Sequence, residues 1–70
     1  MAKKINDKMS ISFLLPTFNE SKNIIPLIKS ILKLNSIYDL EIIVIDDNSS
    51  DGTSLIVSKF SKKNREVILI

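Results

Sequence analysis

Short apolar runs and amphipathic stretches alternate along this chain, and their order predicts its elements. The runs at 11–15 and 42–45 are too short for helices and are bounded by turn-forming residues, so each is predicted to be a strand. Neither run shows the alternation of a half-exposed strand, which favours strands covered on both faces. A third apolar run, 67–70, predicts a further strand.

The stretch between the first two strands has helical spacing. Its apolar positions contain the i, i+3, i+4, i+7 series 24, 27, 28 and 31, which predicts a helix with one buried stripe. Proline fits the first helical turn but clashes further inside, so Pro26 places the regular start between 24 and 26. Asn19 and Ser21 are both candidate N-caps, and Asn35 is a reasonable stop.

A second helix is predicted over residues 53–63, after the second strand. The residues expected in its buried stripe are Leu55, Ile56, Val57 and Phe60. Asp51 lies within two residues of the predicted start, so we expect it to cap the helix. Gly52 completes the turn because glycine accepts positive φ.

The elements therefore alternate as β-α-β-α-β with short links. Such alternation predicts an α/β fold of parallel strands joined by right-handed crossovers, which is half of a doubly wound, Rossmann-like parallel sheet. Residues 1–9 show little periodicity and are expected to form a flexible lead-in. Residues 10–70 then form one folded unit without repeats or low-complexity segments.

Composition narrows the chemistry that the chain can perform. It has no cysteine and no histidine, so disulfides, thiolate ligands and imidazole chemistry are excluded, and carboxylates, amides and hydroxyls remain. The net charge of +2 gives no reason to expect a nucleic-acid partner. No apolar run approaches the ~20 residues that span a bilayer, which predicts a cytoplasmic protein, or one at the cytoplasmic face of a membrane.

Two groups of polar residues follow the first two strands. Asp46 and Asp47 end the second strand, and the ligand crevice of open α/β sheets lies at the carboxyl ends of the strands. Adjacent carboxylates repel and resist desolvation, so stability alone does not favour them there, although turn and cap roles are the alternative. After the first strand, Phe18 and Glu20 could stack on and hydrogen-bond a planar base, or could belong to a turn and a capped helix.

Three familiar ligand loops are excluded by spacing. The residues at 47, 49, 51 and 52 match part of a calcium-binding EF-hand, but Ser58 stands where that loop needs glutamate. Gly52 is the only glycine, so neither the phosphate loop nor the dinucleotide fingerprint is present.

Taken together, two motifs carry a family resemblance. Leu15-Pro-Thr-Phe-Asn-Glu20, followed by Asn23 and then Ile45-Asp-Asp-Asn-Ser-Ser-Asp-Gly-Thr53, resembles the opening of the inverting nucleotide-sugar glycosyltransferases of family 2, which have the GT-A fold. The resemblance runs from about residue 10 to residue 70. Within the family, these two motifs are most similar to those of polyprenol-phosphate and dolichyl-phosphate sugar (mannosyl) transferases.

The resemblance implies that the ends of the first two strands bind the nucleotide of a GDP-sugar or UDP-sugar. Pro16, Phe18 and Glu20 would line the base pocket, Asp47 would accept a hydrogen bond from the base imino N–H, and Asp46 would support that loop. The sugar would pass, with inversion, to a polyprenol-phosphate or a hydroxyl acceptor. The family usually has Tyr at the position of Phe18, so stacking remains without a phenolic hydroxyl.

The resemblance also implies what these 70 residues lack. The family's Asp-x-Asp motif, which holds Mg²⁺ or Mn²⁺ against the donor diphosphate, is expected beyond residue 70, with the general base and the acceptor site. We therefore assign no metal ligand or catalytic residue in this chain, and expect it to be catalytically incomplete alone. The alternative is a stand-alone small α/β module that binds nucleotide or a partner without catalysis. An incomplete domain should aggregate through its unpaired third strand, whereas a module should melt cooperatively.

Overall fold

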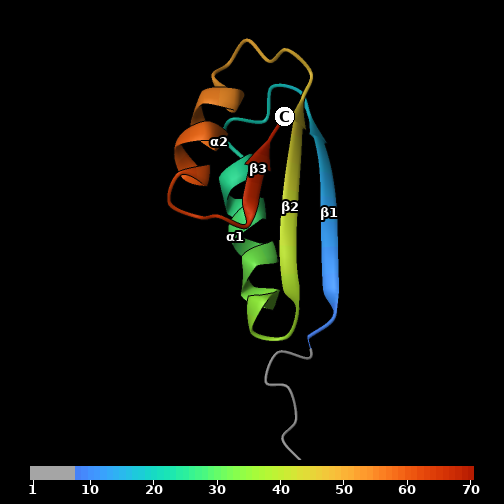
Figure 1. Cartoon of the computed structure of the whole chain (residues 1–70). Coiled ribbons are helices and arrows are strands. Elements are labelled where there is room, and N and C mark those ends of the chain that lie inside the picture. The colour runs from blue at the N-terminus through green and yellow to red at the C-terminus, as the bar shows by residue number, and fades with distance from the viewer. Residues whose placement is uncertain (1–7) are drawn as a thin grey trace, which may run out of the picture.

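Residues 8–70 form a three-stranded parallel sheet with helices between the strands, as described by a computed structural model (Figure 1). Residues 1–7 of the predicted lead-in lie outside the residues that the structure describes. The elements are β1 (Ser10–Thr17), α1 (Ile24–Leu32), the short 3-10 helix η1 (Lys33–Ser36), β2 (Asp39–Asp46), α2 (Thr53–Ser61) and β3 (Val67–Leu69). The strands pair in the order β1-β2-β3. This confirms the predicted β-α-β-α-β, Rossmann-like arrangement.

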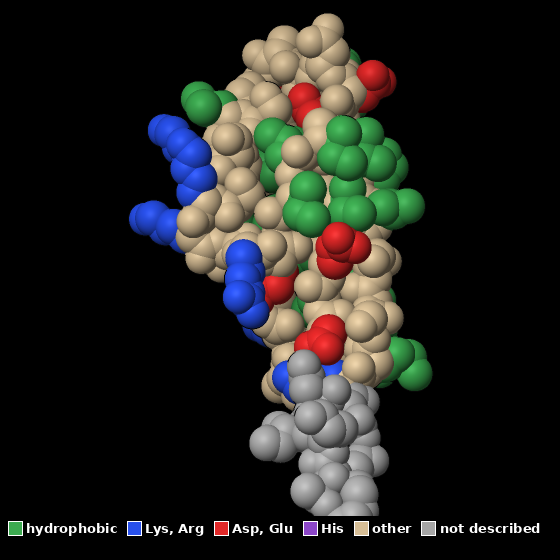
Figure 2. All heavy atoms as spheres, in the orientation of Figure 1, with side chains coloured by type: hydrophobic (Ala, Val, Ile, Leu, Met, Phe, Trp, Pro, Cys, Tyr) green, Lys and Arg blue, Asp and Glu red, His purple; other side chains and the backbone are tan. Residues whose placement is uncertain are grey.

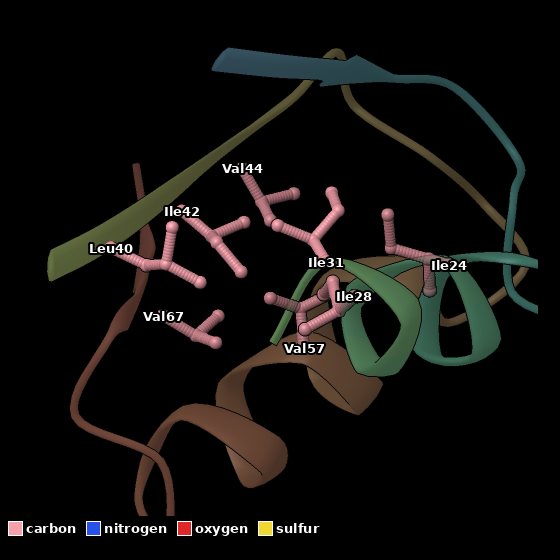
Figure 3. Close-up of a cluster of buried hydrophobic side chains, with 8 residues drawn as sticks. All are labelled: Ile24, Ile28, Ile31, Leu40, Ile42, Val44, Val57 and Val67. Carbon is pink, nitrogen blue, oxygen red and sulfur yellow. The ribbon is translucent and has the colours of Figure 1, made fainter. Parts of the chain in front are cut away.

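Both α-helices lie on the same face of the sheet (Figure 1). The sequential strand order requires both crossovers to step in the same direction, and crossovers of one hand then place their helices on one face. The core between the two layers is aliphatic, and Figure 3 shows its members: Ile24, Ile28, Ile31, Leu40, Ile42, Val44, Val57 and Val67. The central strand β2 supplies every second residue, as the pleat requires.

The other face of the sheet is uncovered within residues 8–70. The prediction of strands covered on both faces is therefore wrong for this part of the chain. Along β1, Leu14 is 62% exposed while its neighbours Phe13 and Leu15 are half-buried. Ile45 on β2 and Ile68 on β3 are exposed too, and Figure 2 shows hydrophobic side chains gathered over the strands. The apolar runs lacked alternation because the open face is also apolar.

Strand β1 continues through Pro16, whereas the sequence predicted its end at residue 15. The carbonyls of Met9 and Thr17 accept hydrogen bonds of 2.9 Å from the N–H groups of Asp39 and Asp47. Odd-numbered residues of β1 therefore direct their backbone groups toward β2, and Pro16 directs its nitrogen to the free edge. Because no donor is needed at that edge, the proline does not interrupt the strand.

The start of α1 agrees with the prediction, but its cap does not. The N-cap is Asn23 rather than Asn19 or Ser21. The backbone carbonyl of Glu20 accepts hydrogen bonds from the N–H groups of Asn23 and Ile24, at 3.0 and 2.8 Å, so a turn rather than a side chain begins the helix.

Each helix buries a narrower stripe than its sequence predicts. Leu27 of α1 is 47% exposed and Leu55 of α2 is 60% exposed, so both were wrongly assigned to the buried stripe. A helix on a small sheet with no neighbour on its outer side buries only the row that faces the strands. Helix α2 also ends at Ser61, two residues before the predicted end.

Candidate functional site

Two loops meet at the carboxyl ends of β1 and β2, and we call them the first loop (residues 18–23) and the second loop (residues 47–52). The register pairs Thr17 with Asp46, so the two strands end side by side. The two polar groups noted in the sequence are therefore brought to one edge of the sheet, as predicted.

Asp46, the last residue of β2, is committed to holding the second loop. One carboxylate oxygen accepts hydrogen bonds from the hydroxyl groups of Thr17, at 3.1 Å, and Ser49. The other accepts the backbone N–H of Ser49 at 3.0 Å. These hydrogen bonds, chiefly those from Ser49, lower the pKa of Asp46 below its usual value because they favour the charged form. Asp46 therefore supports the loop.

The two loops are joined by hydrogen bonds between the backbone of one and the side chains of the other. The four contacts are Asn19 N–H to Ser49 Oγ (2.8 Å), Glu20 N–H to Thr53 Oγ1 (3.0 Å), Ser21 N–H to Asp51 Oδ2 (3.0 Å) and Ser50 N–H to Asn19 Oδ1 (2.9 Å). We call this set the loop clamp. It fixes the first loop against the second and against the start of α2.

Asp51 connects the first loop to the start of α2. Its carboxylate accepts hydrogen bonds from the hydroxyl and, at 3.1 Å, the backbone N–H of Thr53, the first residue of α2. The Thr53 hydroxyl, followed by Ser21, lowers the pKa of Asp51 to about 2. The predicted capping role of Asp51 is confirmed in this form, although Gly52, with φ of 88°, is the N-cap residue itself. The left-handed conformation at Gly52 is the one expected for glycine in this turn.

The side chains of Phe18 and Asp47 remain free at this edge. Phe18 is 59% exposed, and the carboxylate of Asp47 is exposed and takes no part in a hydrogen bond within residues 8–70. Glu20 is also exposed, and its carboxylate accepts only a 3.3 Å hydrogen bond from the Asn23 amide. An aromatic face and free acceptors therefore stand beside loops that other residues hold in place.

A cleft of about 430 Å³ opens beside the first loop, between the end of β1 and α1. Its lining residues are Leu15, Pro16, Thr17, Glu20, Asn23, Ile24 and Leu27. Of the predicted site residues, Pro16 and Glu20 line this cleft. Phe18, Asp46 and Asp47 belong to the same edge of the sheet but do not line it.

Sequence reasoning missed the residues that join the loops. Thr17 and Thr53 are buried polar residues, and their hydroxyl groups contact Asp46 and the first loop. A local signal existed for Thr17, because it occupies a core-facing position of β1 next to a polar loop. No local signal existed for Asn19 with Ser49, since the partners are 30 residues apart.

The described carboxylates do not form a cluster of metal ligands. Within residues 8–70 no group of three or more Asp or Glu side chains lies together in a way that could hold a metal ion. The oxygens of Asp46 and Asp51 already accept hydrogen bonds from hydroxyl and amide groups. We therefore derive no chemical step through a metal at this edge. Within residues 8–70, no helix is both long enough and apolar enough to cross a bilayer.

Comparison with known proteins gives a family match over most of the chain. The family model described as Glycosyl transferase family 2 matches residues 12–70. An uncharacterized protein of Methanocaldococcus jannaschii is 44% identical over 50 residues, which cover 71% of this chain and 20% of that protein. No solved structure matches significantly.

Two further relatives are synthases. The poly-beta-1,6-N-acetyl-D-glucosamine synthase of Staphylococcus epidermidis is 43% identical over 54 residues, covering 77% of this chain and 13% of the synthase. The chondroitin synthase of Pasteurella multocida is 30% identical over 61 residues, covering 87% of this chain and 6% of the synthase. The chain thus spans at most a fifth of the length of these three curated relatives.

Proposed function

Because the chain belongs to glycosyl transferase family 2, we propose that its first and second loops bind the nucleotide of a nucleotide-sugar donor. The observation that carries this proposal is that the carboxylates at the end of β2 and in the second loop differ in their contacts. Asp46 and Asp51 are occupied in holding the loops, whereas Asp47 is exposed and free within residues 8–70. A free hydrogen-bond acceptor on a fixed loop is suited to recognise a hydrogen-bond donor of a ligand.

The groups at this edge fit the parts of a nucleoside. The exposed ring of Phe18 offers a stacking face for a planar base, and the Asp47 carboxylate accepts a hydrogen bond from a base imino N–H. Glu20 and Pro16, which line the neighbouring cleft, complete the base pocket in this proposal. The residues are those expected from the family resemblance.

The proposal keeps two classes of donor but favours one class of acceptor. GDP-sugars and UDP-sugars both present an imino N–H on the base, so the proposal includes both donors. Two relatives are synthases of poly-beta-1,6-N-acetyl-D-glucosamine and chondroitin. Of the two acceptors that the sequence resemblance implied, a hydroxyl and a polyprenol phosphate, these names favour a sugar hydroxyl. We assign the divalent cation of the donor diphosphate to a complete family 2 domain, because no group of three or more Asp or Glu side chains lies together within residues 8–70.

Complete sugar transfer is not assigned to these residues alone. The chain spans 20%, 13% and 6% of the three relatives, and the described part offers no cationic cluster or metal site at the loops to stabilise a leaving diphosphate. We place donor binding on residues 8–70 and the transfer step on a complete family 2 domain.

Titration of the folded chain with UDP and with GDP tests the proposal, with amide chemical shifts as the readout. We expect the shifts to change in the two loops. Asp47→Asn should weaken binding about 10- to 100-fold, because a hydrogen bond to a charged group contributes about 1.5–3 kcal/mol. Asp39→Asn is the matched control, since Asp39 begins β2 at the opposite end of the sheet.

Two results would contradict the assignment. A folded wild-type chain that binds neither nucleotide would remove the proposed function. A folded Asp47→Asn variant that binds as tightly as Asp39→Asn would show that Asp47 does not contact the base.

A further inference from the structure

Acidic and basic side chains are segregated in this molecule. No acidic residue occurs from residue 21 to 38 or from 52 to 65, the two stretches that contain the helices. These stretches carry Lys22, Lys29, Lys33, Lys59, Lys62, Lys63 and Arg65. The acidic residues of the described chain lie in the strands and the loops. Figure 2 shows Lys and Arg side chains along the side of the molecule that the helices occupy.

A shallow apolar groove runs between α1 and α2 on this basic side. Its volume is about 510 Å³, and its lining residues are Ile25, Ile56, Lys59, Phe60, Lys62 and Lys63. Lys29 lies four residues after Ile25 and shares its row on α1, whereas Lys22 precedes the helix and belongs to the first loop. Lysines from both helices therefore flank an apolar floor.

The exposed side chain of Leu55 adds to the apolar surface of the groove. Leu55, next to Ile56 in α2, is 60% exposed and lies four residues before Lys59, on the same row of the helix. The helix layer thus has the composition of an interfacial helix pair, with apolar side chains among lysines whose long stems can carry the charge outward.

We propose that the outer face of α1 and α2 binds a membrane surface that contains anionic lipids. Lysine ammonium groups would lie at the level of the lipid phosphates, and Leu55 and Ile56 would enter the boundary with the acyl chains. Charge complementarity alone would also fit a nucleic acid. The apolar floor favours the lipid surface, because phosphate contacts to a nucleic acid need no exposed leucine.

This surface is independent of the nucleotide site. The loops lie at the carboxyl ends of the strands, while the groove lies on the helix layer, on the opposite side from the open sheet face. Binding at the groove would therefore leave both loops accessible, and the proposal stands whether or not nucleotide binds.

Co-sedimentation with phosphatidylcholine vesicles, with and without phosphatidylglycerol, tests the proposal. We expect the chain to sediment only with the anionic vesicles and to be released by high salt. Lys59→Gln with Lys63→Gln should weaken vesicle binding about 25-fold, since each lysine near such a surface contributes about fivefold. The control with the same change in charge is Lys8→Gln with Arg65→Gln, residues that flank a different pocket near the start of β2, and it should weaken binding less.

The apolar contribution distinguishes a membrane from other polyanions. Leu55→Ser should weaken vesicle binding, whereas Leu14→Ser, an equally exposed leucine on the sheet, should not. The proposal is overturned if folded wild-type chain ignores anionic vesicles, or if the two lysine pairs have equal effects. It is also overturned if a DNA duplex binds as well as the vesicles and Leu55→Ser changes neither, which would indicate a nucleic-acid surface. Circular dichroism of each variant verifies that it remains folded.

Discussion

Three aspartates of one loop region differ in what their carboxylates contact. Asp46 and Asp51 accept hydrogen bonds from serine and threonine donors, and the pKa of each is lowered by them. The side chain of Asp47 makes no such contact within residues 8–70. Geometry at this edge is therefore maintained by two aspartates, while the third is available to a ligand.

The lowered pKa of Asp51 predicts acid sensitivity. The pKa is about 2 in the folded chain, below the ordinary 3.8 that we expect when unfolded, so ionised Asp51 favours the folded state. This stabilisation is present above about pH 4 and is lost as the pH falls through about 2. Asp51→Asn should lower the melting temperature at neutral pH and reduce the further decrease on acidification, measured by circular dichroism.

Asp47→Asn is the control for this prediction, because it removes a carboxylate from the same loop without removing a hydrogen bond within the described chain. We expect it to keep the wild-type dependence of melting temperature on pH. If the Asp51→Asn variant loses as much stability on acidification as the wild type, the carboxylate of Asp51 does not stabilise the folded state.

The sequence predicted that the two polar loops share one edge of the sheet, but it did not predict the contacts between them. Asp46 and Asp47 could be located because an apolar strand ends at them, and strand ends mark ligand crevices in parallel sheets. The loop clamp could not be predicted, because it depends on the register of Thr17 with Asp46 and joins loops 30 residues apart. Spacing along a chain encodes local contacts, and these contacts are not local.

At the scale of elements, periodicity located the strands and helices but not which apolar residues they bury. Pro16 was taken to end β1, yet a proline is compatible with an edge strand when its nitrogen faces away from the partner. Leu27 fitted the helical stripe by spacing, yet it is exposed. Both errors have the same cause. Whether a strand lies at an edge of the sheet, and whether another layer covers a helix, depends on the assembled fold and not on the local sequence.

The exposure difference between Leu27 and Ile28 predicts unequal effects within one helix. Ile28 of α1 is fully buried in the core cluster, which also contains residues of β2 and α2. Ile28→Val should therefore lower the free energy of unfolding by about 0.5–1.5 kcal/mol, and Ile28→Ala by about 2–5 kcal/mol. A single core of this size supplies only about 3–5 kcal/mol, so the alanine variant should be largely unfolded. Leu27→Ala should change stability by less than about 0.5 kcal/mol.

Urea unfolding followed by circular dichroism compares these variants directly. Equal effects of Leu27→Ala and Ile28→Ala would mean that α1 packs with a different face toward the sheet.

For the whole molecule, the chief consequence of the fold is that only one side of the sheet is covered. Parallel sheets generally have both faces covered, whereas residues 8–70 leave Leu14, Ile45 and Ile68 exposed. The outer edges of β1 and β3 also have no strand partner in the described chain. Apolar area and free backbone groups thus coincide on one side of the molecule.

This exposure predicts that the isolated 70-residue chain associates with a second copy through the open sheet face. Introducing charge with Leu14→Lys should shift the chain toward monomer without changing its helix and strand content, as measured by sedimentation velocity over a range of concentrations. Leu55→Lys is the matched control, because Leu55 is 60% exposed and Leu14 is 62% exposed, but Leu55 lies on the helix layer. A wild-type chain that stays monomeric at high concentration would show that the open face does not drive association. The same conclusion would follow if the two variants shifted the chain toward monomer equally.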